Sequence, residues 1–135
     1  VILFLKTHHV RKGEAPLMKV DPVLTPEKLA SLKQQIQEIV LEEKLLTYIA
    51  EIVLKTRNHP HLFLGGSPRA SLAIMNASKA FAAINGRDFV IPEDIKKTLV
   101  PVLGHRIILS PEREMEGMTT ESVIETITQS IEIPR

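Results

Sequence analysis

The sequence contains no cysteine and no tryptophan, and its aromatic residues are one tyrosine and four phenylalanines. Without cysteine the chain can form no disulfide framework, no thiolate nucleophile and no thiolate zinc site. This composition is compatible with a reducing compartment, and we expect a cytoplasmic protein. The small number of aromatic side chains also argues against a nucleic-acid partner, because single-stranded nucleic acids are usually held by base stacking on such rings.

The chain also lacks a large excess of charge and a long apolar run. Its 17 Lys and Arg residues against 16 Asp and Glu residues give a net charge of +1, so no strong nonspecific attraction to nucleic acid or anionic lipid is expected. No apolar run approaches the roughly 20 residues that span a bilayer, and we expect no membrane insertion. The first residues, VILFLKTHH, contain no initiating methionine and do not have the pattern of a signal peptide. We interpret them as part of a helix from a larger protein and treat the chain as a fragment.

Motifs for independent catalysis are missing. The phosphate-binding pattern G-x-x-x-x-G-K-[ST] does not occur, so this segment should not hold a triphosphate by itself. Ser67 is not surrounded by the G-x-S-x-G pattern of a nucleophile. The five histidines lack the helical i, i+4 spacing of a tuned metal site and are better explained as solvated or capping residues, so no metal site is expected. An enzyme that acts alone is therefore the least favoured class.

Helical periodicity dominates the remainder of the chain. At 135 residues with 44% hydrophobic composition, the chain can bury roughly two-thirds of its unfolded surface. Apolar residues recur at three- and four-residue steps, and no long alternating strand competes with them. The pattern predicts an all-α fold, a small bundle of four to five helices. The apolar trio 107–109 is either a short strand or an extended strap, which its length does not decide. The expected helices cover about 26–42, 43–57, 67–84, 92–103 and 120–131.

The helix over 43–57 has apolar residues around most of its circumference and is expected to be central and buried. It contains Tyr48, whose ring should pack in the core while its hydroxyl reaches the surface. A ligand-stacking role for Tyr48 is a weaker alternative. Arg57 at the end of this helix suits the negative end of the helix dipole, and Arg87-Asp88 is interpreted as a local ion pair in a turn.

One helix start has an unexpected charge. Proline at the first helical position is followed by glutamate at Pro26, Pro92 and Pro111, which suits the positive end of the helix dipole. In Ser67-Pro68-Arg69 the residue after proline is a cation, at a cost of about 0.3–1 kcal/mol at an exposed site. Arg69 is then either a surface residue whose stem covers apolar surface or the ligand of an anion. In the second case the Ser67 cap, the free N–H groups and the guanidinium converge on a phosphate.

A longer pattern surrounds Arg69. The run LGGSPRASLAIMNASKAFAAINGRDFVIPEDIKKTLVPVLGHRIILSP resembles the C-terminal lid of MoxR-type AAA+ ATPases, which have a similar SPRA helix start, a GRD turn and an HR ending. The upstream stretch from Tyr48 to Pro60, with its Thr56-Arg57, is similar to the same family. Together these segments cover about residues 20–110.

The resemblance implies a role for each residue at this helix start. Arg69 is expected to be the sensor 2 arginine, which the lid points at the γ-phosphate of ATP bound in a preceding α/β core. Ser67 and Ala70 would shape the nucleotide-binding helix start, with Tyr48 as a weak further candidate. The parent protein is expected to be an ATP hydrolase that uses ATP and Mg²⁺. This fragment lacks the Walker A and Walker B motifs and should be inactive alone, with no tightly bound cofactor.

The resemblance also implies partners and boundaries. The expected partners are the chain's own N-terminal ATPase core, neighbouring subunits of a ring, usually a hexamer, and von Willebrand factor A domain proteins, in a chaperone-like remodelling machine. Lid angle would couple to nucleotide state. Residues 1–20 are assigned to the end of the core or the hinge, 21–109 to the lid, and 110–135 to a C-terminal helix and tail packing on the lid. The alternative is a freestanding helical protein-interaction module without nucleotide binding.

Overall fold

The computed structural model of the chain describes residues 1–10 and 21–134. The chain divides into two compact units, Val1–Ser31 and Leu32–Arg135, which are considered separately. Much of the predicted hinge, residues 11–20, lies outside the described residues. The elements are α1 (Ile2–Val10), α2 (Pro26–Glu38), α3 (Glu43–Arg57), β1 (Leu62–Leu64), α4 (Pro68–Ile84), α5 (Pro92–Leu103), β2 (Ile108–Leu109), α6 (Pro111–Met115) and α7 (Thr120–Gln129).

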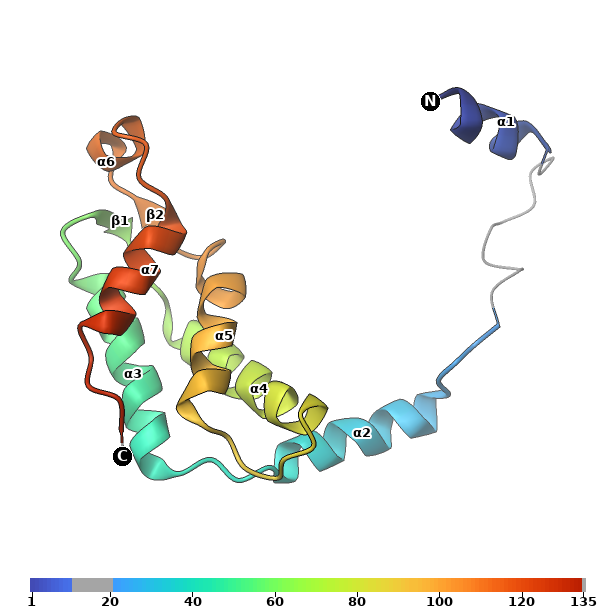
Figure 1. Ribbon diagram of the computed structural model, residues 1–135, viewed down its shortest axis with the longest axis horizontal. Coiled ribbons are helices and arrows are strands. Elements are labelled where there is room, and N and C mark those ends of the chain that lie inside the picture. Colours follow the sequence, from blue (N-terminus) through green and yellow to red (C-terminus); the bar gives the residue numbers. More distant parts are fainter. Residues whose placement is uncertain (11–20, 135) are drawn as a thin grey trace. The chain divides into compact units, whose positions relative to one another are not determined.

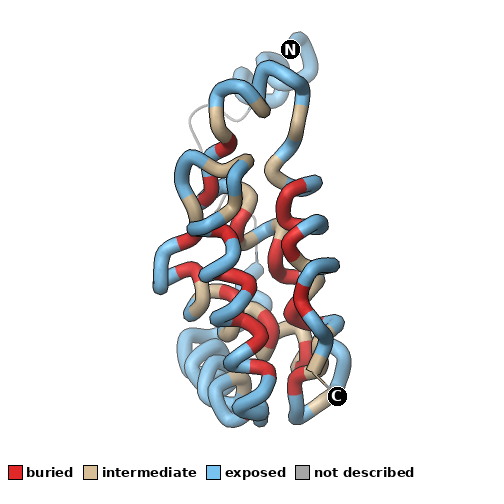
Figure 2. The backbone as a smooth tube through the Cα atoms, turned by 90° about the vertical axis from the view of Figure 1, so that its left-hand side faces the viewer, coloured by how far each residue is buried: buried red, intermediate tan, exposed pale blue. Residues whose placement is uncertain are grey.

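Four helices form the core of the larger unit. Helix α3 contacts α4 and α7, and α5 also contacts α4 and α7, so the four helices close a small bundle (Figure 1). The predicted mostly helical bundle is confirmed. Its interior is mainly aliphatic, and the side chains with the least exposed surface include Ile52, Ile74, Ile95, Leu99 and Leu103. Buried positions recur at intervals along each of these helices, with exposed positions between them (Figure 2).

Helix α3 is buried on one side only. Ile49, Ile52 and Val53 are at most 2% exposed, whereas Leu46 and Leu54 are 43% and 52% exposed. The expectation that α3 is buried around most of its circumference is therefore wrong. The reason is that the larger unit covers α3 on the sides of α4, α7 and β1, which leaves one apolar stripe in contact with solvent.

Helix α2 ends earlier than its periodicity predicts. Its last residue is Glu38, and the chain then becomes extended, so that the Val40 N–H donates to the Asp88 carbonyl at 2.8 Å. The Val90 N–H donates in turn to the Val40 carbonyl at 3.0 Å. These two bonds, which join residues far apart in sequence, replace the last helical turn.

The smaller unit contains an apolar helix with no buried residue. Helix α1 has Ile2, Leu3 and Phe4 at 71–79% exposure. An apolar helix of this kind is normally covered by another protein surface. In the described part of the chain, no helix combines the length and the apolar character needed to cross a membrane.

A two-stranded antiparallel sheet lies beside the bundle. Strand β1 pairs with β2, with Leu62 opposite Leu109 and Leu64 opposite Ile108. The segment 107–109 therefore contains a short strand, which settles the alternative that its length left open. Helix α6 follows, and helix α7 comes after it. The chain beyond α7 is held to α3 by Lys55, whose Nζ donates to the Ser130 carbonyl and to Ser130 Oγ, both at 2.9 Å.

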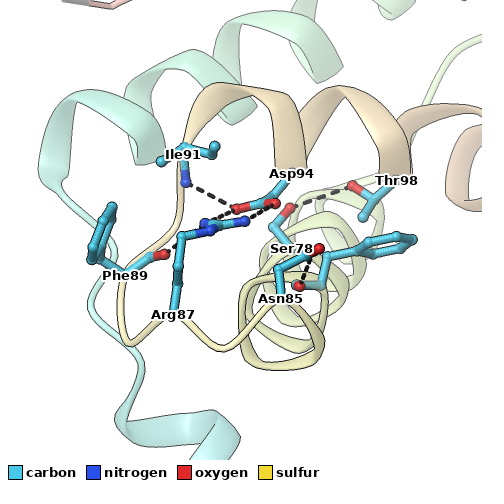
Figure 3. Close-up of polar contacts among 8 residues, drawn as sticks. Ser78, Asn85, Arg87, Phe89, Ile91, Asp94 and Thr98 are labelled. Carbon is cyan, nitrogen blue, oxygen red and sulfur yellow. Dashed lines mark hydrogen bonds and ion pairs between the residues drawn. The ribbon is translucent and has the colours of Figure 1, made fainter.

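An ion pair connects the turn after α4 to the start of α5 (Figure 3). The two guanidinium Nη atoms of Arg87 donate to the two carboxylate oxygens of Asp94, each at 2.7 Å. Asp94 also accepts the Ile91 N–H at 3.0 Å and is 1% exposed. The prediction that Arg87 pairs with the adjacent Asp88 is wrong, because Asp94 is the carboxylate that packing brings within reach.

Candidate functional site at the start of helix α4

The start of α4 is closed by backbone rather than by a side chain. Ser67 occupies the N-cap position with extended backbone angles, φ −79° and ψ 165°, and Pro68 is the first helical residue. Among the described residues the Ser67 hydroxyl makes no cap hydrogen bond, so the expected side-chain cap is wrong. Instead the Ser67 carbonyl accepts the Ala70 N–H at 2.8 Å, which closes the first turn.

This geometry leaves the guanidinium as the main group for an anion. Pro68 has no N–H and the Ala70 N–H is already bonded, so the helix start offers few free backbone donors. Ala70 is fully buried and serves in packing. Arg69 is exposed, the first turn contains no acidic residue, and the guanidinium has no hydrogen-bond or ion-pair partner within residues 1–10 and 21–134. An exposed guanidinium without a partner fits both interpretations that the sequence left open for Arg69, a surface residue or the ligand of an anion.

The two glycines before Ser67 allow the start of α4 to pack closely against the end of α3. A Cβ atom on Gly65 would lie 2.6 Å from Arg57 Cα and 2.6 Å from the Thr56 carbonyl oxygen, too close for any side chain. Neither Gly65 nor Gly66 is among the glycines with positive φ. Glycine is required at position 65 for close approach, and not for a positive φ.

Two residues of α3 that sequence reasoning did not select hold this connection. The Gly66 N–H donates to Thr56 Oγ1 at 2.8 Å, and Arg57 Nε donates to the Gly66 carbonyl at 2.8 Å. The sequence signals for these two residues were their place at a predicted helix end before a glycine pair and the resemblance of the Thr56-Arg57 stretch to the family. Neither contact follows from spacing alone, because both depend on the packing of the loop 65–66 onto α3.

Tyr48 is not part of this arrangement. Its residue surface is 2% exposed and its hydroxyl is buried without a hydrogen-bond partner among the described residues, so the expectation that the hydroxyl reaches the surface is wrong. Burial raises the pKa of the Tyr48 hydroxyl, and the nearby Glu93 carboxylate raises it further. Tyr48 lies about 12 Å along the α3 axis from Thr56, at 1.5 Å per residue. The geometry favours a core role over ligand stacking.

Tyr48→Phe is expected to leave the stability unchanged or to raise it by up to about 1 kcal/mol. The substitution removes a buried hydroxyl that makes no hydrogen bond and keeps the ring that packs in the core. Urea unfolding of the chain measures the change. A loss of more than about 1 kcal/mol would show that the hydroxyl has a partner in solution.

Two histidines lie against each other between α3 and β1. His59 and His61 lie with ring centroids 5.0 Å apart, and the His61 N–H donates to His59 Nδ1 at 3.3 Å. Burial lowers the pKa of His59, and the neighbouring His61 lowers it further. No group of three or more potential ligands gathers among the described residues.

Comparison with known proteins places the site in a family context. Residues 54–127 match the model of the AAA lid domain. The chain is 38% identical over 119 residues to the protein YeaC of Bacillus subtilis and 30% identical over 134 residues to the chaperone MoxR1 of Mycobacterium tuberculosis. The first alignment covers 88% of this chain and 37% of YeaC, and the second covers 93% of this chain and 35% of MoxR1.

The fold has a counterpart among solved structures. The crystal structure of a candidate ATPase from Cytophaga hutchinsonii matches with a TM-score of 0.81 and 30% sequence identity. The match covers 98% of this chain and 43% of the other. The chain therefore spans somewhat more than a third of the length of YeaC and MoxR1, and less than half of the solved structure.

Proposed function

The chain belongs to the AAA lid domain family, in its MoxR-type AAA+ form, and on this basis we propose that it supplies the sensor 2 arginine, Arg69, to an ATPase core in the full-length protein. The observation that carries the proposal is the exposed guanidinium without a partner in the described chain, on a helix start that is packed tightly against α3. A guanidinium of this kind matches a terminal phosphate in charge and in donor geometry.

The residues at the helix start suit ATP held by another domain. The charge of the γ-phosphate would turn the unfavourable placement of Arg69 at the positive helix end into a favourable contact. The core would supply Mg²⁺ and the phosphate-binding loop, since this chain contains no such loop. After hydrolysis Arg69 would lose much of its attraction, so that the position of the lid would follow the nucleotide state.

The proposed partners follow from the same assignment. The apolar helix α1, with Leu3 and Phe4 at 79% and 71% exposure, is suited to burial against the protein's own ATPase core. Neighbouring subunits of a ring, as a hexamer, and von Willebrand factor A domain proteins complete the proposed assembly. In this assembly the bundle would move as a rigid body and drive chaperone-like remodelling of a client.

Hydrogen exchange of the full-length protein tests the proposal. Amides in peptides covering residues 65–72 are expected to become protected with a non-hydrolysable ATP analogue and less so with ADP, relative to the nucleotide-free protein. Peptides from α7 serve as the internal control and should change little. Equal exchange at 65–72 in all three states, with nucleotide shown to be bound, would reject the sensor 2 role of Arg69.

A further inference from the structure

The end of α3 holds both backbone polar groups of one residue, Gly66. Thr56 Oγ1 accepts the Gly66 N–H at 2.8 Å, and Arg57 Nε donates to the Gly66 carbonyl at 2.8 Å. The Thr56 hydroxyl gives its own proton to the Val53 carbonyl at 2.6 Å, so its orientation is fixed. Thr56 is 1% exposed, which shields its bonds from competing water.

This double contact controls the direction in which α4 begins. Gly66 lies three residues before Arg69, and Gly65 already touches the α3 backbone so closely that it has no room for a Cβ atom. The loop cannot slide along α3 without breaking a buried hydrogen bond or meeting the helix backbone. The position of the first turn of α4, which contains Arg69, is therefore fixed relative to the last turn of α3.

We propose that Thr56 and Arg57 are positioning residues for the Arg69 guanidinium. The proposal rests on the proposed function of Arg69 as the group that meets the γ-phosphate. Arg57 acts through its Nε hydrogen bond to Gly66 and not by touching the nucleotide. A small displacement of a group that stabilises developing charge has a large effect on rate, so loosening this contact reduces turnover without removing Arg69 itself.

Two substitutions at Arg57 separate its hydrogen bond from its charge. Glutamine places its Nε2 donor the same number of bonds from the backbone as the Nε of arginine, so Arg57→Gln keeps a donor for Gly66 and loses the charge. Arg57→Met has a similar length and neither donor nor charge. Thr56→Ser and Thr56→Val form a second matched pair, since serine keeps the hydroxyl and valine replaces it by a methyl group.

The experiment measures steady-state ATP turnover and hydrogen exchange on the full-length protein and these four variants. Arg57→Gln and Thr56→Ser are expected to stay within about twofold of wild-type kcat, while Arg57→Met and Thr56→Val lose about tenfold or more, with a smaller change in KM. At residues 65–70, Arg57→Met is also expected to exchange faster than Arg57→Gln, and Thr56→Val faster than Thr56→Ser. If Arg57→Gln falls as far as Arg57→Met with no faster exchange, Arg57 acts by its charge and the proposal is overturned.

The outcome remains distinguishable from failure of the proposed function. If Arg69→Ala retains wild-type turnover, sensor 2 is rejected by that variant, whatever the Arg57 series shows. The hydrogen-exchange data then test the contact between Arg57 and Gly66 separately. Faster exchange at 65–70 in Arg57→Met than in Arg57→Gln supports the control of the helix start by α3, and equal exchange in the two overturns it.

Discussion

Arg69→Ala in the full-length protein is expected to lower kcat for ATP hydrolysis by at least about 100-fold. Its guanidinium is exposed, has no partner among the described residues, and stands in a helix turn without an acidic side chain. At the proposed contact with the γ-phosphate, this cation would stabilise the charge that spreads over the phosphoryl oxygens in the transition state. Steady-state turnover at saturating ATP measures the loss. The fold should survive, because no hydrogen bond or ion pair between described residues involves this exposed side chain.

Two further variants make the result specific. Arg113→Ala removes an equal charge from an exposed ion pair between α6 and Glu116, which follows it, and should leave turnover within about twofold, since such surface pairs contribute little. Arg69→Lys keeps the charge and loses the planar fork, so an intermediate rate is expected. Wild-type turnover in Arg69→Ala would reject the sensor 2 assignment.

The helices were predictable because their signals are local. Proline at the first helical position marks the starts of α4 and α5, and the predicted bounds 43–57 and 92–103 coincide with α3 and α5. Pairing between distant segments was not predictable. Whether 107–109 is a strand depends on β1, and α2 ends before its periodicity does because Val40 bonds with the segment after Gly86.

The site shows the same division between local and distant information. Arg69 could be proposed from the sequence because its charge conflicts with the helix dipole, a comparison that needs only neighbouring residues. The roles of Thr56 and Arg57 require knowledge of which loop lies over the end of α3. A glycine can provide backbone freedom or allow close approach, and only the structure shows that at Gly65 the reason is the close approach to Arg57 and Thr56.

Arg87→Met is expected to lower the melting temperature of the chain by on the order of 10 °C at pH 7.5, and Asp94→Asn by less than half as much. The reason is the unequal burial of the two partners, since the side chain of Asp94 is 2% exposed and that of Arg87 is 23% exposed. Without Arg87 the Asp94 carboxylate is left buried with only the Ile91 N–H at 3.0 Å. Without Asp94 the guanidinium can turn toward water. Calorimetry of both variants measures the asymmetry, and equal losses would contradict it.

The Arg87–Asp94 ion pair also predicts that the wild type and Arg87→Met respond in opposite directions to a fall in pH. Burial alone would raise the pKa of Asp94, but the hydrogen bonds from Arg87 and Ile91 outweigh it and hold the pKa below its ordinary value. The contribution of the ion pair to wild-type stability is therefore complete above the unfolded pKa of about 4 and is lost as the pH falls through the lower folded pKa.

In Arg87→Met, burial is no longer offset by the guanidinium, so the pKa of Asp94 should rise above its ordinary value. Protonation of Asp94 then removes the buried charge. The loss of melting temperature in Arg87→Met relative to the wild type should therefore shrink between pH 7.5 and pH 5, a range in which the wild type hardly changes. A deficit independent of pH would mean that Asp94 reaches water once Arg87 is gone.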